Sequence, residues 1–257
     1  MVINLENVNY RRNGELILSD ISWQVAENEH WVILGLNGSG KTTLLNLIIG
    51  YFFPVVGSKA QLLNYTFGDC PIADLRKHIG WISNALQQNL PLSDTPLDIV
   101  LSGKFASIGL WEKVTEADRA EGEAILDKLG ILSLKTRTYG SLSQGEKQKV
   151  LIGRALISNP EILIFDEAYN GLDIFAKKDL SEIITKLARD SKKTLIFVTH
   201  NTEEILPIFN KALLLKDGKI HSQGDLQEVI VQENLEDFYG NEVDVFQHGE
   251  KFFILAK

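Results

Sequence analysis

Alternating apolar and polar positions dominate the start of the chain. Ile3, Leu5 and Val8 roughly alternate with polar residues, a turn signal follows at Gly14, and a second alternating run occupies 17–25. A period of two is typical of half-buried β-strands. These residues predict an antiparallel β portion at the N-terminus.

Three short, mainly apolar runs depart from that alternation. They occupy 30–34, 162–165 and 194–199, and the apolar residues over 42–49 and 174–189 have helical spacing. Strands that are apolar on both faces and alternate with helices form parallel sheets covered on both sides. The chain is therefore expected to be an α/β protein with a mostly parallel central sheet.

The stretch from about 84 to 139 has a more helical pattern. One helix is predicted over 95–101 and another over 115–129. The second begins with a threonine, has Asp118 three positions later as in a capping box, and is followed by Gly130. We predict that this stretch is mainly helical.

Two hairpins are predicted toward the C-terminus. Asp217 and Gly218 separate two apolar runs, which is a strong signal for a tight turn between antiparallel strands. Phe246 and Phe252 lie on either side of a polar turn at 248–251, and they predict a small terminal hairpin.

Composition narrows the class of protein. The 257 residues are 44% hydrophobic and 23% charged, as in ordinary globular chains, and their net charge is −8. That charge argues against a nucleic-acid partner, because phosphate backbones attract an excess of Lys and Arg. The apolar runs are far shorter than the ~20 residues that span a bilayer, and no signal-peptide pattern opens the chain. We expect a cytoplasmic protein that does not insert directly into a membrane.

The first chemical motif lies where the apolar run 30–34 meets the helix predicted over 42–49. Its sequence, Gly-Leu-Asn-Gly-Ser-Gly-Lys-Thr, matches the phosphate-binding P-loop in full. Backbone N–H groups can surround phosphate oxygens there, Lys41 can reach the β- and γ-phosphates, and the Thr42 hydroxyl can ligate Mg²⁺. The competing interpretation is a glycine-rich turn with a surface lysine. The predicted nucleotide-binding residues of this loop are Gly35, Leu36, Asn37, Gly38, Ser39, Gly40, Lys41, Thr42 and Thr43.

Two carboxylates follow the apolar run 162–165. Asp166 and Glu167 end a buried strand, and such strands deliver their last residues to the edge of the sheet where the P-loop also lies. Asp166 can hold Mg²⁺ through water, while Glu167 can orient and polarise an attacking water molecule. The alternative is that both residues are solvated acids at a capped strand end, and the presence of a P-loop makes this interpretation less favoured.

Residues 142–146 read Leu-Ser-Gln-Gly-Glu and precede that strand by about twenty positions. Ser143 and Glu146 have the spacing of a capping box, so the motif is a well-made helix start whatever else it does. Gly145 leaves backbone N–H groups near the helix start open to an anion.

The order of these motifs resembles the ABC ATPase family. The P-loop, the signature at 142–146, the strand that ends in Asp-Glu, Gly-Leu-Asp at 171–173 and a histidine after a strand occur in the family's order, and the resemblance extends from residue 3 to about 224. It implies a P-loop NTPase fold in a single domain, 1–257. The implied parts are a nucleotide-binding core at 1–84 and 146–230, a helical subdomain at 85–145 with the signature at its end, and a C-terminal hairpin extension at 231–257.

The resemblance also implies a composite site for ATP and Mg²⁺ between two cassettes, which favours a homodimer. Ser143 and Gly145 would bind the γ-phosphate held by the other copy's P-loop, and Asp173 would link the two sites. His200 would contact the γ-phosphate and hold the attacking water together with Glu167. Without that context, a lone histidine at a strand end is usually a partly buried polar residue.

Tyr10 occupies the position of the family's adenine-stacking aromatic residue, although an ordinary strand tyrosine is the alternative. Departures from the family pattern occur elsewhere. Asn84 replaces the usual glutamine near Mg²⁺ and is one methylene shorter, in a loop that normally couples the site to a membrane subunit. Gln144 and Glu146 stand where glycine and glutamine are commoner, and Ala168 stands where proline is frequent.

Three functions are compatible with this resemblance. The favoured one is the ATPase subunit of an ABC transporter, held on the cytosolic face of the membrane by a separate transmembrane permease. The alternative is a soluble ABC ATPase with a regulatory or assembly role, as in iron–sulfur cluster assembly. Glu167 and His200 speak against a third function, a sensor that does not hydrolyse ATP. The sequence over 167–176 also looks similar to a ModF/YlmA-like subgroup of the family.

Overall fold

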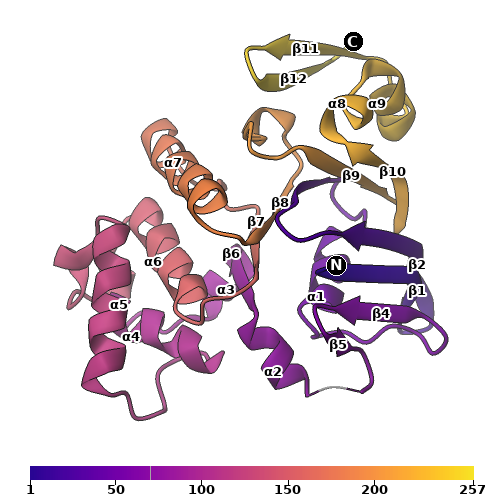
Figure 1. The fold of residues 1–257 in the computed structure, drawn as a ribbon. Helices are drawn as coiled ribbons and strands as arrows, with labels where there is room; N and C mark the ends of the chain where they lie inside the picture. The colour runs from indigo at the N-terminus through magenta and orange to yellow at the C-terminus, as the bar shows by residue number, and fades with distance from the viewer. Residues whose placement is uncertain (70) are drawn as a thin grey trace. The chain divides into compact units, whose positions relative to one another are not determined.

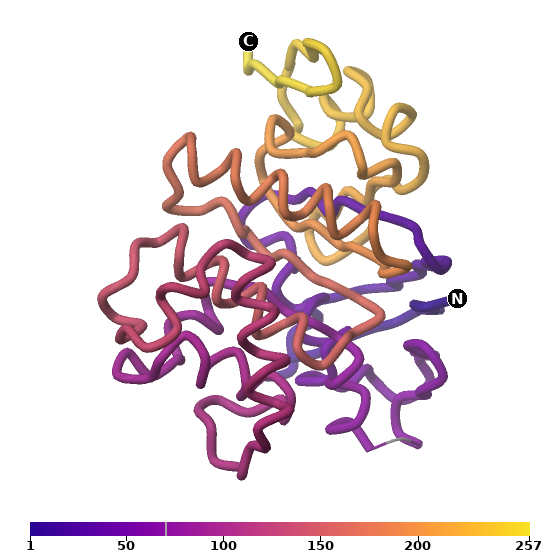
Figure 2. Tube along the Cα trace, turned by 60° about the vertical axis from the view of Figure 1, so that its left-hand side comes forward, coloured from indigo at the N-terminus to yellow at the C-terminus, as the bar shows by residue number. Residues whose placement is uncertain are grey.

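The computed structural model of the chain describes residues 1–69 and 71–257. These residues form two compact units (Figures 1 and 2). One unit contains Met1–Leu75 and Thr194–Lys257, and the other contains Arg76–Lys193. Both ends of the chain therefore belong to the same unit. The predicted division into a nucleotide-binding core and a helical subdomain stays a prediction.

The N-terminal residues of the first unit form an antiparallel sheet with the strand order β2-β1-β4-β5 (Figure 1). Its strands are β1 (Ile3–Arg12), β2 (Glu15–Val25), β4 (Lys59–Leu62) and β5 (Tyr65–Thr66). Ile3 pairs with Val25 of β2 on one side and with Leu62 of β4 on the other, and all three side chains are fully buried. The predicted antiparallel portion is confirmed.

Parallel pairing in the first unit centres on the strand that precedes the P-loop. The strands are β3 (His30–Leu34), β8 (Thr194–Thr199), β9 (Lys211–Lys216) and β10 (Lys219–Asp225). β3 pairs in parallel with both β8 and β9, whereas β10 pairs antiparallel with β9. Asp217 and Gly218 form the turn with φ values of 49° and 72°, as their sequence predicts.

Short helices complete the first unit. They are α1 (Lys41–Ile48), α8 (Leu226–Val229) and α9 (Gln232–Tyr239), with a 3₁₀ helix η4 (Thr202–Glu204), while α2 (Ile72–Lys77) continues into the second unit. The terminal hairpin consists of β11 (Val243–His248) and β12 (Lys251–Ala256). Val243 and Phe252 of this hairpin are buried, and β12 packs against η4. The predicted hairpin is confirmed.

The second unit contains the parallel pair β6 (Ile79–Ser83) and β7 (Ile162–Asp166). α6 (Gln144–Leu156) packs against β6. A Cβ at Gly80 would lie 2.6 Å from the Leu163 side chain and 3.0 Å from the Ala155 side chain. The absence of a side chain at Gly80 thus permits the close approach of helix and strand.

The remaining helices of this unit lie mostly within the stretch predicted to be helical. They are α3 (Asn84–Asn89), α4 (Pro96–Ser102), η1 (Gly103–Phe105), α5 (Glu116–Lys128), η2 (Leu132–Leu134), η3 (Tyr139–Ser141) and α7 (Ile174–Asp190). The predicted capping box at Thr115 and Asp118 starts α5. Thr95 caps α4, since its hydroxyl accepts a hydrogen bond from the Asp98 N–H at 3.1 Å.

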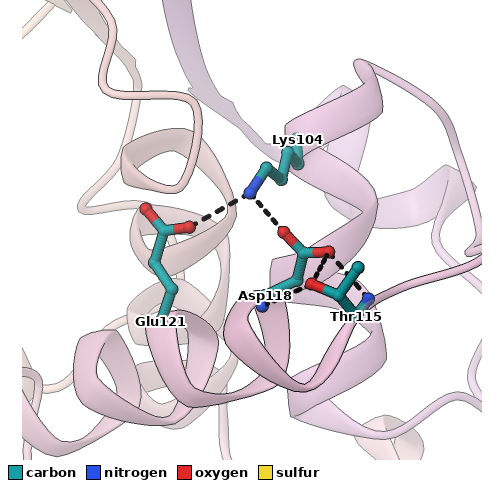
Figure 3. Close-up of polar contacts among 4 residues, drawn as sticks. All are labelled: Lys104, Thr115, Asp118 and Glu121. Atoms are coloured by element: carbon teal, nitrogen blue, oxygen red, sulfur yellow. Dashed lines mark hydrogen bonds and ion pairs between the residues drawn. The ribbon is translucent and has the colours of Figure 1, made fainter.

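Charged side chains join η1 to the first turns of α5 (Figure 3). The Lys104 ammonium donates to the Asp118 carboxylate and, at 3.2 Å, to Glu121 Oε2. The other oxygen of Asp118 accepts from the Thr115 N–H at 2.8 Å. The hydrogen bond from Lys104 is the largest cause that holds the pKa of Asp118 well below its usual range, and the bond from the Thr115 backbone is the next largest.

Within residues 1–69 and 71–257, the structure contains no helix that combines the length and apolar character needed to cross a membrane.

Candidate nucleotide-binding and hydrolysis site

The P-loop joins the buried strand β3 to helix α1, as predicted. Gly38 and Gly40 have φ values of 82° and 104°, in the left-handed region that glycine adopts readily. No side chain among the described residues caps the start of α1, and its first turn carries no acidic residue. The N–H groups and positive dipole end of this helix are therefore suited to a phosphate group.

Lys41 lies buried against the loop it follows. Its ammonium donates to the carbonyl oxygens of Gly35 at 2.7 Å and Leu36 at 3.1 Å. Phosphate oxygens would compete for these same N–H donors, and a buried charge–charge contact is stronger than a bond to a neutral carbonyl. The loop thus holds its lysine where a nucleotide phosphate can recruit it.

Tyr10 stacks on Phe52. The two ring centroids are 4.8 Å apart and the ring planes differ by 8°. Tyr10 belongs to β1, and Phe52 follows the C-terminal end of α1. Phe52 was not among the predicted site residues, because its pairing with Tyr10 spans more than forty positions. The stack places two aromatic rings in the unit that carries the P-loop, and aromatic rings can stack on a flat base.

Asp166 ends β7, and the chain turns sharply at the residue that follows it. Glu167 has φ 50°, which is uncommon for a residue with a side chain and typical of functional turns. Asn170 holds this turn twice: its N–H donates to the Glu167 carbonyl at 3.1 Å, and its Nδ2 donates to Glu167 Oε2 at 2.7 Å. Asn170 orients the predicted water-activating carboxylate, a role that our sequence analysis did not predict.

Asp173 serves as the N-cap of α7. Its Oδ1 accepts hydrogen bonds from the N–H groups of Phe175 and Ala176, both at 2.9 Å. Ile174 and Phe175, the first helical residues, are 76% and 78% exposed. The predicted interface aspartate thus begins a helix whose first two apolar side chains face away from the unit's core.

The signature residues form the predicted capping box at the start of α6. The Ser143 N–H donates to Glu146 Oε2 at 2.7 Å, and the Glu146 N–H donates to Ser143 Oγ at 3.3 Å. The bond from the Ser143 backbone holds the pKa of Glu146 below its usual value. A Cβ at Gly145 would lie 3.2 Å from the Ala176 side chain, so this position favours glycine for packing as well as for anion access.

Asn84 is the first residue of α3, and the preceding Ser83 caps that helix. Asn84 Oδ1 accepts a long hydrogen bond, 3.4 Å, from Nε2 of Gln148, which is 1% exposed. The amide oxygen predicted to approach Mg²⁺ is thus held by a buried residue of α6.

His200 follows β8 at the turn into η4. The Thr199 hydroxyl donates to Glu204 Oε2 at 2.7 Å and accepts from the Asn201 N–H at 3.0 Å, so the turn around His200 is fixed on both sides. His200 and Leu36 of the P-loop line one hollow of about 540 Å³ together with residues of the terminal hairpin. The first unit therefore brings the histidine turn and the P-loop to the same hollow.

The other predicted residues gather within the second unit. Asn84 and the signature are linked through α6, whereas Asp166 and Glu167 lie at the end of β7. In the part of the chain that the structure describes, no group of three or more His, Cys, Asp or Glu side chains could hold a metal ion.

Comparison with known proteins agrees with this set of motifs. A family model described as ABC transporter matches residues 18–170. The uncharacterized ABC transporter ATP-binding protein YlmA of Bacillus subtilis is 43% identical over 256 residues, which cover 99% of this chain and 97% of YlmA. The ABC transporter ATP-binding protein ModF of Escherichia coli is 35% identical over 206 residues, which cover 79% of this chain and 42% of ModF.

A solved structure extends the comparison to assembly. The ATP-binding cassette MJ0796, in a dimeric post-hydrolysis state bound to ADP and Pi, superposes with a TM-score of 0.74 at 26% identity. The match covers 87% of this chain and 98% of MJ0796. A cassette with the same fold thus binds nucleotide as a dimer.

Proposed function

The chain belongs to the ABC transporter family of ATP-binding proteins, and from this membership we propose that it couples ATP hydrolysis to a separate membrane permease. It is an ATPase cassette that acts as a head-to-tail dimer, and its similarity to YlmA and ModF agrees with the predicted subgroup. The soluble assembly function is not favoured, because the matching proteins are described as transporter subunits.

We assign ATP binding to the first unit's aromatic stack and P-loop. Tyr10 would stack on adenine, and the P-loop N–H groups with Lys41 would hold the phosphates. The Thr42 hydroxyl, Asp166 and the Asn84 amide oxygen are the oxygen donors expected around Mg²⁺ and its waters. This ion would neutralise charge on the phosphates during transfer.

The catalytic assignment centres on Glu167. Its carboxylate, oriented by Asn170, would accept a proton from the water that attacks the γ-phosphate, while His200 would contact that phosphate and help to hold the water. The N-terminal end of α6, with Ser143 and Gly145, would bind the γ-phosphate held by the partner copy. The orientation of Glu167 by Asn170 is the observation that carries the assignment.

In this proposal, the separate permease carries the substrate through the membrane. We place the cassette dimer on the cytosolic face of the membrane, bound to the permease. ATP would close the two copies around two nucleotides, and hydrolysis would release them.

The Glu167→Gln variant tests this proposal. It replaces the carboxylate with an amide of nearly the same size that cannot accept the proton, so we expect ATP turnover to fall at least about a hundredfold. ATP should trap this variant as a dimer in size-exclusion chromatography with light scattering. Glu182→Gln, which alters an exposed carboxylate of α7, is the matched control and should behave as wild type.

The two readouts separate the parts of the proposal. Wild-type turnover in Glu167→Gln would remove Glu167 from the mechanism. A pull-down of the trapped variant from detergent-solubilised native membranes, analysed by mass spectrometry, tests the coupling to transport. Recovery of a stoichiometric multi-span protein is the expected result, and recovery of the cassette alone would contradict the permease assignment.

A further inference from the structure

Four amide side chains lie together in the second unit. Gln87 of α3 and Gln144 of α6 exchange two hydrogen bonds, each of 3.0 Å, from the Nε2 of one to the Oε1 of the other. The buried Gln148 Nε2 lies 3.4 Å from Asn84 Oδ1 and 3.5 Å from Gln87 Oε1. The contacts thus run from Asn84 through Gln148 and Gln87 to Gln144.

The two ends of this chain of amides are positions that differ from the motifs implied by the resemblance to the family. Asn84 replaces a commoner glutamine, and Gln144 replaces a commoner glycine. A glycine at 144 has no side chain and could not form either bond to Gln87. Gln144 therefore creates a connection to α3, the helix that begins at Asn84.

The position of Gln144 makes this connection relevant to the site. It is the first residue of α6 and lies between Ser143, the N-cap, and Gly145. The paired amides are partly buried, and a reciprocal pair fixes the orientation of both side chains more tightly than one bond would. The link therefore restrains the signature turn against the start of α3.

We propose that Gln87 and Gln144 are positioning residues that couple the Asn84 end of α3 to the signature turn. If the Asn84 amide oxygen turned toward a bound Mg²⁺, Gln148 Nε2 would lose that acceptor and keep its contact with Gln87 Oε1. The Gln87–Gln144 pair would transmit this change to the N–H groups at the start of α6. The orientation of Asn84 would thereby adjust how firmly the same copy binds the γ-phosphate of its partner. This inference rests on the proposed function.

A double-mutant cycle in the full chain tests the coupling. Gln87→Ala, Gln144→Gly and their combination are compared with wild type in ATPase assays at varied ATP and Mg²⁺ concentrations. The control is Asn89→Ala. Asn89 is another amide on α3, and its Nδ2 donates a hydrogen bond to the Ala85 carbonyl of the same helix. Thermal denaturation of every variant measures any loss of folding.

We expect each single substitution to raise the Mg²⁺ concentration for half-maximal activity roughly fivefold, with kcat changed less than KM for ATP. The double variant should resemble the single ones, since either substitution breaks the same pair. Asn89→Ala should retain the wild-type Mg²⁺ dependence.

Other outcomes decide against the coupling. Additive effects in the double variant, or an unchanged Mg²⁺ dependence in Gln144→Gly, would show that the pair serves only local packing. The proposed function is judged separately, because ATP-trapped dimers of Glu167→Gln form whether or not the amide pair contributes. Introducing Gln144→Gly into that variant should raise the ATP concentration needed for dimer formation, and an unchanged requirement would also overturn the inference.

Discussion

At the scale of single residues, the site is built from side chains whose partners are already in place. Lys41 is held by two carbonyls of its own loop, and Glu167 is held by Asn170. Pre-orientation of this kind reduces the reorganisation that binding or proton transfer requires. Substituting Lys41, or the residue that holds Glu167, should therefore affect ATP binding or proton transfer rather than folding as a whole.

The Lys41→Met variant should bind ATP more than tenfold more weakly. Methionine retains an apolar stem in the buried position but cannot make the charge-assisted bond to phosphate, which contributes about 1.5–3 kcal/mol. Isothermal titration calorimetry with ATP and Mg²⁺ measures the difference, with Lys178→Met on the exposed face of α7 as control. Equal affinities for the two variants would contradict the role of Lys41.

Asn170→Ala should lower kcat about tenfold while KM for ATP stays nearly constant. The substitution removes the amide that orients the Glu167 carboxylate, and a hydrogen bond to a charged group contributes about 1.5–3 kcal/mol. Steady-state ATPase assays separate the two constants. Asn234→Ala removes an amide that bonds backbone carbonyls near α8 and should leave both unchanged. A rise in KM with unchanged kcat in Asn170→Ala would argue for a role in binding instead.

At the scale of elements, the sequence predicted most helix starts because their signals are local. The capping boxes at Thr115–Asp118 and Ser143–Glu146 need only residues three positions apart, and both occur as predicted. The apolar strands were predictable for the same reason. The partners Phe52 and Gln148 were missed, since their contacts with Tyr10 and Asn84 join positions far apart in the sequence. The helices α8 and α9 were not predicted from the sequence.

The link between η1 and α5 predicts a pH dependence of stability (Figure 3). Since the folded state lowers the pKa of Asp118, its stabilising contribution is complete above the unfolded-state pKa and is lost as the pH falls through the folded-state value. The urea midpoint of Asp118→Asn should therefore lie below that of wild type at pH 7, and the gap should narrow as the pH drops below about 4. A gap that is constant with pH would indicate that the carboxylate charge does not contribute.

At the scale of the whole molecule, the terminal hairpin is the part whose relation to function the sequence did not reveal. The Phe246–Phe252 pattern predicted a hairpin but not its place in the fold. In the structure, β12 packs against η4, directly after the His200 turn, and hairpin residues share a hollow with His200 and Leu36. The extension thus supports the turn that carries a predicted catalytic residue.

A chain that ends at Gly240 should unfold at a lower temperature and hydrolyse ATP more slowly. It loses the buried side chains of Val243 and Phe252. Each contributes about 1.5–3 kcal/mol when fully buried, so the Tm should fall by roughly 6–24 °C. Because η4 loses its cover, we expect kcat to fall several-fold while ATP affinity, set by the P-loop, changes less than twofold. Calorimetry, ATPase assays and ATP titration at a temperature below both transitions measure the three quantities.

Glu250→Ala, at the exposed hairpin turn, is the control that keeps the hairpin. Wild-type kcat in the shortened chain would limit the hairpin to a stabilising role, whereas a loss of kcat and ATP affinity together would indicate that it supports the P-loop as well.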